Sequence, residues 1–107
     1  MGATQGQSGL GAPPEQRRLI ARFEGRVQGV GFRYTAVDLA QNLGLTGFVR
    51  NMLDGSVELV AEGPEADLRS LLSKIQRSNL GRYIVDVHQQ WAPARGEFAD
   101  FSISFDV

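Results

Sequence analysis

The stretch that decides the fold is Leu19–Gly44, LIARFEGRVQGVGFRYTAVDLAQNLG. It begins with a run in which every second residue (Leu19, Ala21 and Phe23) is apolar, which is typical of a strand with one buried face. Apolar residues then recur at helical spacing, at Ala36, Val37, Ala40 and Leu43. The glycine that closes the stretch is a common C-terminal cap, so the sequence predicts a strand, a glycine-rich turn and a helix.

The rest of the chain shows the same two periodicities again. Strands are predicted at residues 47–51, 56–62, 83–91 and 101–105, with a turn at Leu53-Asp54-Gly55 between the first two. A second helix is predicted to open at Gly63-Pro64, because proline is favoured in the first helical turn. The apolar stripe of this helix consists of Leu68, Leu71, Leu72 and Ile75.

The resulting order is βαββαβ with a short fifth strand, which predicts an α+β fold of the ferredoxin-like sandwich type. The strands alternate, so the antiparallel sheet should have one face in water and both helices on the other. Residues 1–17 are rich in Gly, Gln and Pro, and we expect them to form a disordered N-terminal tail. A single domain is expected over residues 18–107.

Composition limits the kinds of ligand and partner. The 107 residues carry a net charge of −1, which disfavours general electrostatic binding to nucleic acid or to an anionic membrane. The chain has no cysteine and a single histidine, His88, so thiolate metal sites, disulfides and a cysteine nucleophile are excluded. We expect a cytoplasmic protein without nucleic-acid or membrane partners. We also expect a monomer, because the apolar residues are all assigned to one core.

The turn that contains Gly25, Gly29 and Gly31 combines backbone freedom with positive charge. A loop that wraps an anion needs several inward N–H groups, in conformations that glycine adopts without steric penalty. The turn also leads into a helix N-terminus, where Arg33 could hold two phosphate oxygens at once. The P-loop motif is absent, because no Gly-Lys-Ser or Gly-Lys-Thr occurs. From these residues alone, an anion-binding loop and a plain turn with exposed arginines both stay open.

Two motifs resemble the signatures of the acylphosphatase family. One is Gly25–Arg33, GRVQGVGFR, and the other is Gly47–Asn51, GFVRN. The turn after the second motif and the helix start at Glu62-Gly63-Pro64 are also similar, so the resemblance covers residues 18–105. It implies a ferredoxin-like hydrolase that converts acyl phosphates to a carboxylate and inorganic phosphate. The family reaction uses no metal, no cofactor and no covalent enzyme intermediate.

The resemblance also implies a role for each motif residue. Arg33 would bind the phosphoryl group and Asn51 would orient the attacking water, as the two catalytic residues. The implied phosphate-binding set is Arg26, Val27, Gln28, Gly29, Val30, Gly31, Phe32 and Arg33, mostly through loop N–H groups. Such a site suits phosphoryl transfer, which depends mainly on positioning and charge stabilisation. If the strand that ends at Asn51 pairs beside the first strand, Arg33 and Asn51 should face one crevice.

Other polar and aromatic residues are expected to have structural roles. Arg50 should face the side of its strand opposite Asn51, and His88 should be solvated. Trp91, Phe101, Ile103 and Phe105 are expected to belong to the core, with Val85 on the same strand face as Trp91. Many family members have a basic residue where this chain has Ser104, so folding stability or substrate affinity can differ there.

Two other functions compete with hydrolysis. One is a non-catalytic module that binds phosphate or an acyl phosphate, similar to the acylphosphatase-like domain of larger carbamoyl-phosphate-handling maturation proteins. The presence of Asn51 favours the enzyme over this module. The other is an RNA-binding ferredoxin-like domain, which would need stacking aromatics on its central strands. The strand at residues 56–62 offers no aromatic side chain in either register, so this function ranks last.

Overall fold

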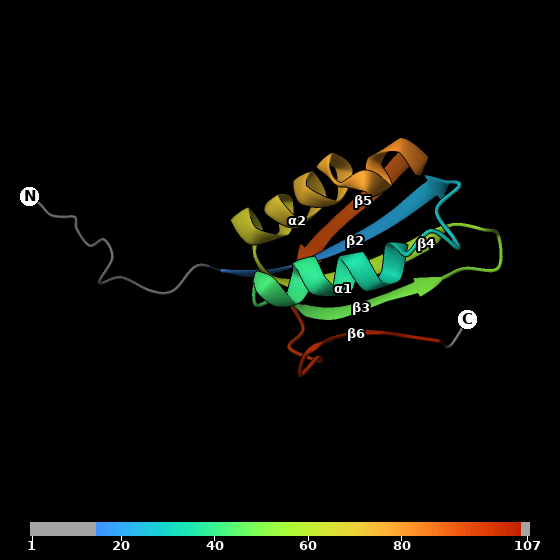
Figure 1. The fold of residues 1–107 in the computed structure, drawn as a ribbon. Helices are drawn as coiled ribbons and strands as arrows, with labels where there is room; N and C mark the ends of the chain where they lie inside the picture. Colours follow the sequence, from blue (N-terminus) through green and yellow to red (C-terminus); the bar gives the residue numbers. More distant parts are fainter. Residues whose placement is uncertain (1–14, 106–107) are drawn as a thin grey trace, which may run out of the picture.

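A computed structural model describes residues 15–105 and shows two helices on one face of a five-stranded sheet (Figure 1). The elements are β2 (Gln16–Gly25), α1 (Phe32–Asn42), β3 (Thr46–Asn51), β4 (Val57–Pro64), α2 (Glu65–Arg77), the short 3₁₀ helix η1 (Asn79–Tyr83), β5 (Ile84–Pro93) and β6 (Phe101–Ile103). The predicted order of strands and helices and the α+β class are confirmed. β2 begins within the predicted tail, of which residues 1–14 lie outside the described part of the chain.

The strand order in the sheet is β5-β2-β4-β3-β6. β2 pairs antiparallel with β4 and β5, and β3 pairs antiparallel with β4, but β6 runs parallel to β3. The condition from which a shared crevice was predicted, that β3 pairs beside β2, is therefore not met, because β4 lies between them. Since β2 and β3 are both antiparallel to β4, the C-terminal ends of β2 and β3 still lie at the same end of the sheet. The β2–α1 loop and the β3–β4 turn meet there, as Figure 1 shows.

The core lies between the sheet and the two helices. Its largest fully buried side chains are Leu19, Phe23, Val27, Phe32, Val49, Val57, Leu59, Leu68, Leu71, Ile75 and Phe101. The predicted alternation in β2 is confirmed, since its apolar positions are buried whereas Arg22 between them is exposed. Full burial of a large apolar side chain contributes about 1.5–3 kcal/mol to folding.

None of the helices within residues 15–105 has the length and apolar character needed to cross a membrane.

Several residues expected in the core are not fully buried. Phe105 is 72% exposed and lies beyond β6, which ends at Ile103. Val85 is 84% exposed and lies where the pairing of β5 with β2 shifts register. Trp91 and Ile103 are partly buried against the edge of the core. Phe101 is buried as predicted.

An ion-pair network centred on the buried Arg18 and Glu62 lies at the end of the sheet opposite the β2–α1 loop. The Arg18 guanidinium donates to the carboxylates of Glu62 at 2.7 Å and Glu97 at 2.6 Å. Glu62 also accepts hydrogen bonds of 2.9 Å from the backbone N–H groups of Arg95 and Gly96. Burial opposes ionisation of Glu62, but the backbone and guanidinium donors outweigh it and lower the pKa of this carboxyl. The network fixes the segment that leads from β5 to β6.

Candidate active site

The loop between β2 and α1 is anchored to the core at both ends. Val27 is fully buried, and the centroid of the buried Phe32 ring lies 4.9 Å from the centroid of the Phe23 ring. Aromatic pairs at this distance stabilise a fold beyond the area that they bury. Residues 28–31 therefore span two fixed points and lie at the surface, at the edge of the sheet.

Two polar contacts hold the same loop to distant parts of the chain. The Arg26 N–H donates to the Tyr83 carbonyl at 3.0 Å. The Gln28 side-chain nitrogen donates to the carbonyl oxygens of Met52 and Ser56 at 2.8 and 2.9 Å. The Arg26 N–H is thus already paired, which removes it from the predicted phosphate-binding N–H groups. The side-chain amide of Gln28 is directed to the β3–β4 turn, so a phosphate in the loop could contact only the backbone of Gln28.

Gly29 and Gly31 give the loop its curvature. Their φ angles are 79° and 81°, in the left-handed region that residues with a Cβ avoid. Gly31 also caps the N-terminus of α1. Among the described residues, none accepts a hydrogen bond from the N–H of Gly29 or Gly31. The loop therefore offers unpaired N–H groups beside the positive end of a helix, which favours an anion.

A crevice of about 170 Å³ opens at this loop. It is lined by Val27, Gly29, Gly31, Phe32, Arg33, Tyr34 and Asn51. Arg33 and Asn51 thus line one crevice, as the sequence predicted, even though their strands are not neighbours. Arg26, Gln28 and Val30, which complete the predicted phosphate-binding set, do not line it. One water occupies about 30 Å³ in the liquid, so the crevice has room for a phosphoryl group.

Arg33 is the second residue of α1 and stands at the positive end of that helix. Its guanidinium forms no ion pair within residues 15–105 and lies over the ring of Phe105, with the guanidinium carbon 5.5 Å from the ring centroid. No described carboxylate therefore neutralises this charge. Sequence reasoning missed Phe105, because its alternation with Phe101 and Ile103 pointed to the core.

Asn51 is the last residue of β3 and lines the crevice. Its side-chain oxygen is buried. Within the described part of the chain, this oxygen has no hydrogen-bond donor. A buried polar atom without a partner costs about 1–3 kcal/mol, so such an atom usually marks a place for a ligand or a water.

Arg50 pairs with Glu58 at 2.8 Å, and thus has the surface role that was predicted for it.

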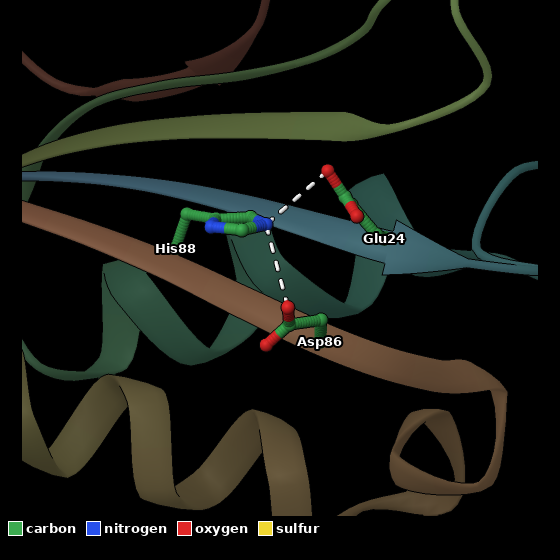
Figure 2. A group of neighbouring side chains, drawn as sticks. All are labelled: Glu24, Asp86 and His88. Carbon is green, nitrogen blue, oxygen red and sulfur yellow. Dashed lines mark ion pairs between the residues drawn. The ribbon is translucent and has the colours of Figure 1, made fainter.

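A second group of ionisable side chains lies on the open face of the sheet. Figure 2 shows His88 between Glu24 and Asp86. The His88 Nε2 atom lies 3.2 Å from a Glu24 carboxylate oxygen and 3.5 Å from an Asp86 carboxylate oxygen. The three are close enough together to hold a metal ion. However, Arg22 donates to the same Glu24 oxygen at 2.9 Å, so a guanidinium already occupies that ligand atom. His88 is exposed, as predicted, and lies outside the crevice.

Two larger hollows, of about 400 and 320 Å³, are less suited to an anion. The first lies along β5 and includes Asp86, and the second includes Glu24 and Asp54. The pKa of Asp54 is lowered, mainly by hydrogen bonds from the side chain and the backbone of Ser56. Ionised carboxylates repel a phosphate, so the smaller crevice is the better candidate for the active site.

Comparisons with known proteins agree with this geometry. The sequence matches the family model for acylphosphatase over residues 19–103. The chain belongs to the acylphosphatase family. The acylphosphatase of Acidothermus cellulolyticus is 46% identical over 91 residues, which cover 82% of this chain and 87% of that relative. The acylphosphatase of Paenarthrobacter aurescens is 49% identical over 89 residues, which cover 83% of this chain and 95% of that relative.

Solved structures place the fold in the same family. The crystal structure of acylphosphatase from Bacillus subtilis has a TM-score of 0.75 at 33% identity, and the match covers 83% of this chain and 99% of that one. Full-length HypF, solved in a phosphate- and nucleotide-bound form, contains a similar unit, with a TM-score of 0.75 at 26% identity over 88% of this chain and 12% of HypF. The curated acylphosphatases and the shared fold support an enzyme that hydrolyses acyl phosphates.

Proposed function

We propose that this acylphosphatase-family chain cleaves the carboxyl–phosphate anhydride in the crevice between the β2–α1 loop and Asn51. The phosphoryl group is held by the unpaired backbone N–H groups of Gly29 and Gly31 and by the Arg33 guanidinium. The left-handed glycines, the positive end of α1 and the unneutralised charge of Arg33 support this assignment, because all three favour an anion at one place. Preorganised donors of this kind contribute about 3–4 kcal/mol each to a transition state.

The observation that carries the proposal is the buried, unpaired oxygen of Asn51. A water that donates a hydrogen bond to this oxygen would be held in the crevice, with a lone pair free to attack phosphorus. The water oxygen forms a new bond to phosphorus while the bond from phosphorus to the bridging oxygen breaks. The carboxylate leaves with the electron pair of that bond.

The proton of the water passes to a phosphate oxygen of the substrate. The described lining of the crevice includes no carboxylate, imidazole or thiol that could accept it. A strong base is not needed, because a carboxylate is a good leaving group and phosphoryl transfer depends on positioning and charge. The same lining offers neither a set of metal ligands nor an activated nucleophile, so we propose a metal-independent reaction without a covalent intermediate.

Hydrolysis of benzoyl phosphate in excess chelator tests this proposal. The full chain is compared with Arg33→Ala and with Arg77→Ala, a control that removes an exposed arginine at the end of α2. Wild type and Arg77→Ala should turn over at similar rates, whereas Arg33→Ala should lose at least about 100-fold in kcat. An inactive wild type, or full activity in Arg33→Ala, would contradict the proposed reaction.

A module that binds phosphate without turnover is the second candidate. The similarity to one unit of phosphate-bound HypF favours it, whereas a binding module would have no use for a water held at Asn51. Titration with inorganic phosphate separates the two candidates. Phosphate affinity that depends on Arg33, in a chain that does not hydrolyse benzoyl phosphate, would identify the binding module.

We further propose that the chain acts as a monomer in the cytoplasm. The buried apolar residues form one cluster inside the described fold, which supports a self-contained subunit. Size-exclusion chromatography with light scattering should give a mass near 11.7 kDa. A dimer mass at micromolar concentration would contradict the monomer.

A further inference from the structure

Two exposed aromatic side chains lie at the crevice or against its arginine. Among residues 15–105, the large apolar side chains that are mainly exposed are Tyr34 (68%), Leu53 (91%), Val85 (84%) and Phe105 (72%). Tyr34 lines the crevice, Leu53 belongs to the turn that follows Asn51, and Phe105 lies against Arg33. Tyr34 and Phe105 are thus available to contact a ligand that is bound at Arg33.

The backbone fixes Phe105 at this place. β6 runs parallel to β3 with Ile103 opposite Val49, and the Ser104 N–H continues the pairing by donating to the Val49 carbonyl at 2.9 Å. Because the two segments advance in the same direction, Phe105 is carried toward the end of β3 that holds Asn51. Backbone pairing, and not core packing, therefore positions this side chain.

Only part of the Phe105 ring is used by its contact with Arg33. The guanidinium carbon lies 5.5 Å from the ring centroid, which is typical of a cation–π contact. With 72% of the residue exposed, most of the ring surface is left free. This free surface adjoins the place where a phosphoryl group would meet the guanidinium.

The proposed phosphoryl site also directs the acyl group of the substrate. Hydrogen bonds of normal length place phosphorus roughly 4 Å from the guanidinium carbon of Arg33. A single bridging oxygen joins the acyl carbon to phosphorus, so the acyl group begins next to Arg33 as well. The loop surrounds the phosphoryl end, so the acyl group extends away from the loop, past Tyr34, which lines the crevice, and toward Phe105, which contacts Arg33.

We propose that Phe105 binds the acyl group and that, together with Tyr34, it selects acyl phosphates with a bulky apolar acyl group over small ones. This inference rests on the proposed function and adds a substrate class to it. An apolar acyl group would cover ring surface that is otherwise hydrated, which favours binding. A small acyl group would cover little of the ring and gain little from it.

The selectivity of the enzyme for benzoyl over acetyl phosphate tests the inference. The ratio of kcat/KM for the two substrates is measured for wild type, Phe105→Ala, Phe105→Tyr and Val85→Ala, with circular dichroism as a check on folding. Phe105→Ala should lower the ratio about threefold to tenfold, as expected for loss of an aromatic contact. Phe105→Tyr retains a ring and Val85→Ala removes an exposed apolar group on β5, so both should keep the wild-type ratio.

The other outcomes are also decisive. An equal loss for both substrates in Phe105→Ala would mean that the ring acts through Arg33 on the phosphoryl group, and would overturn the acyl-binding role. An unchanged ratio would overturn it as well. In both cases wild-type turnover would leave the proposed function intact. A wild type that hydrolyses neither substrate would overturn the proposed function and this inference together.

Discussion

The side-chain nitrogen of Gln28 lies 2.8 Å from the carbonyl oxygen of Met52, and this contact joins the β2–α1 loop to the strand end that carries Asn51. The same nitrogen donates to the Ser56 carbonyl at 2.9 Å. That carbonyl also accepts the Met52 N–H at 2.8 Å, which closes the turn. One amide thus fixes the spacing between the two sides of the crevice, although Gln28 and Met52 are 24 residues apart.

Removing the Gln28 amide should impair catalysis more than it lowers the free energy of unfolding. Gln28→Ala leaves two partly buried carbonyl groups with fewer donors, which should cost about 1–2 kcal/mol of unfolding free energy. We expect KM for benzoyl phosphate to rise and kcat to fall, because the loop and Asn51 are no longer held together. Steady-state kinetics beside urea unfolding measure both effects. Gln76→Ala, an exposed glutamine of α2, is the matched control, and equal kinetics in the two variants would argue against the clamp.

Replacement of Asn51 should separate turnover from binding. Asn51→Ala removes the proposed water ligand, and we expect kcat to fall by about 100-fold or more. The inhibition constant of inorganic phosphate should stay near its wild-type value, since the anion is held by the loop and Arg33. Thermal stability should not fall greatly, because the variant also removes a buried oxygen without a partner. Full turnover in this variant would exclude Asn51 from the mechanism.

Alanine at the loop glycines should impair the site by conformation alone. A Cβ at Gly29 or Gly31 would meet nothing within 4 Å, so the cost is that of a left-handed backbone, about 1–2 kcal/mol. The alternative is that the loop changes shape, and either result should weaken phosphate affinity. Gly96→Ala is a close control, because Gly96 has φ of 68° and an equally open Cβ position outside the crevice. Gly96→Ala should lower the free energy of unfolding by a similar amount but keep the wild-type kinetics. Isothermal titration with phosphate distinguishes the variants.

The Glu62 carboxylate should make the fold sensitive to acid. Its pKa in the folded state is lowered from the ordinary value of 4.5, so its stabilisation is present above that value and is lost as pH falls through the lowered pKa. The free energy of unfolding should therefore decline below about pH 4.5. Glu62→Gln should reduce this decline and should cost about 3 kcal/mol at pH 7, because the buried Arg18 loses a partner.

Urea unfolding at pH 7 and at pH 4 measures this effect. Glu58→Gln is the control, since its partner Arg50 is 29% exposed and the pair should contribute about 1 kcal/mol or less. An acid dependence in Glu62→Gln that equals that of the wild type would show that other carboxylates cause it.

The elements of the fold could be predicted because their signals are local. The alternation at Leu19, Ala21 and Phe23 and the helical spacing from Ala36 depend on residues that are adjacent in sequence. The order of strands in the sheet depends instead on pairing between distant segments, and local patterns do not reveal which strands pair. The sequence therefore did not reveal that β4 lies between β2 and β3.

The placement of the motif residues could also be predicted in part. Arg33 and Asn51 were found from motifs and line one crevice, but their surroundings depend on packing between distant segments. The exposure of Phe105 follows from where β6 ends, and the pairing of the Arg26 N–H depends on Tyr83. The unpaired oxygen of Asn51 could not be foreseen either, since every neighbouring donor had to be located first.

The hydrogen bond from Arg26 to Tyr83 links the β2–α1 loop to a residue more than half the chain away. Contacts of such high sequence separation form late, after much of the chain entropy has been lost. The anion site should therefore be absent from partly folded chains and appear together with the docked β5. Phosphate would then bind only the native state and stabilise it, by about 2.7 kcal/mol at a hundredfold excess over its dissociation constant. Resistance to proteolysis should consequently rise with phosphate concentration, so that the ligand reports on the completeness of folding.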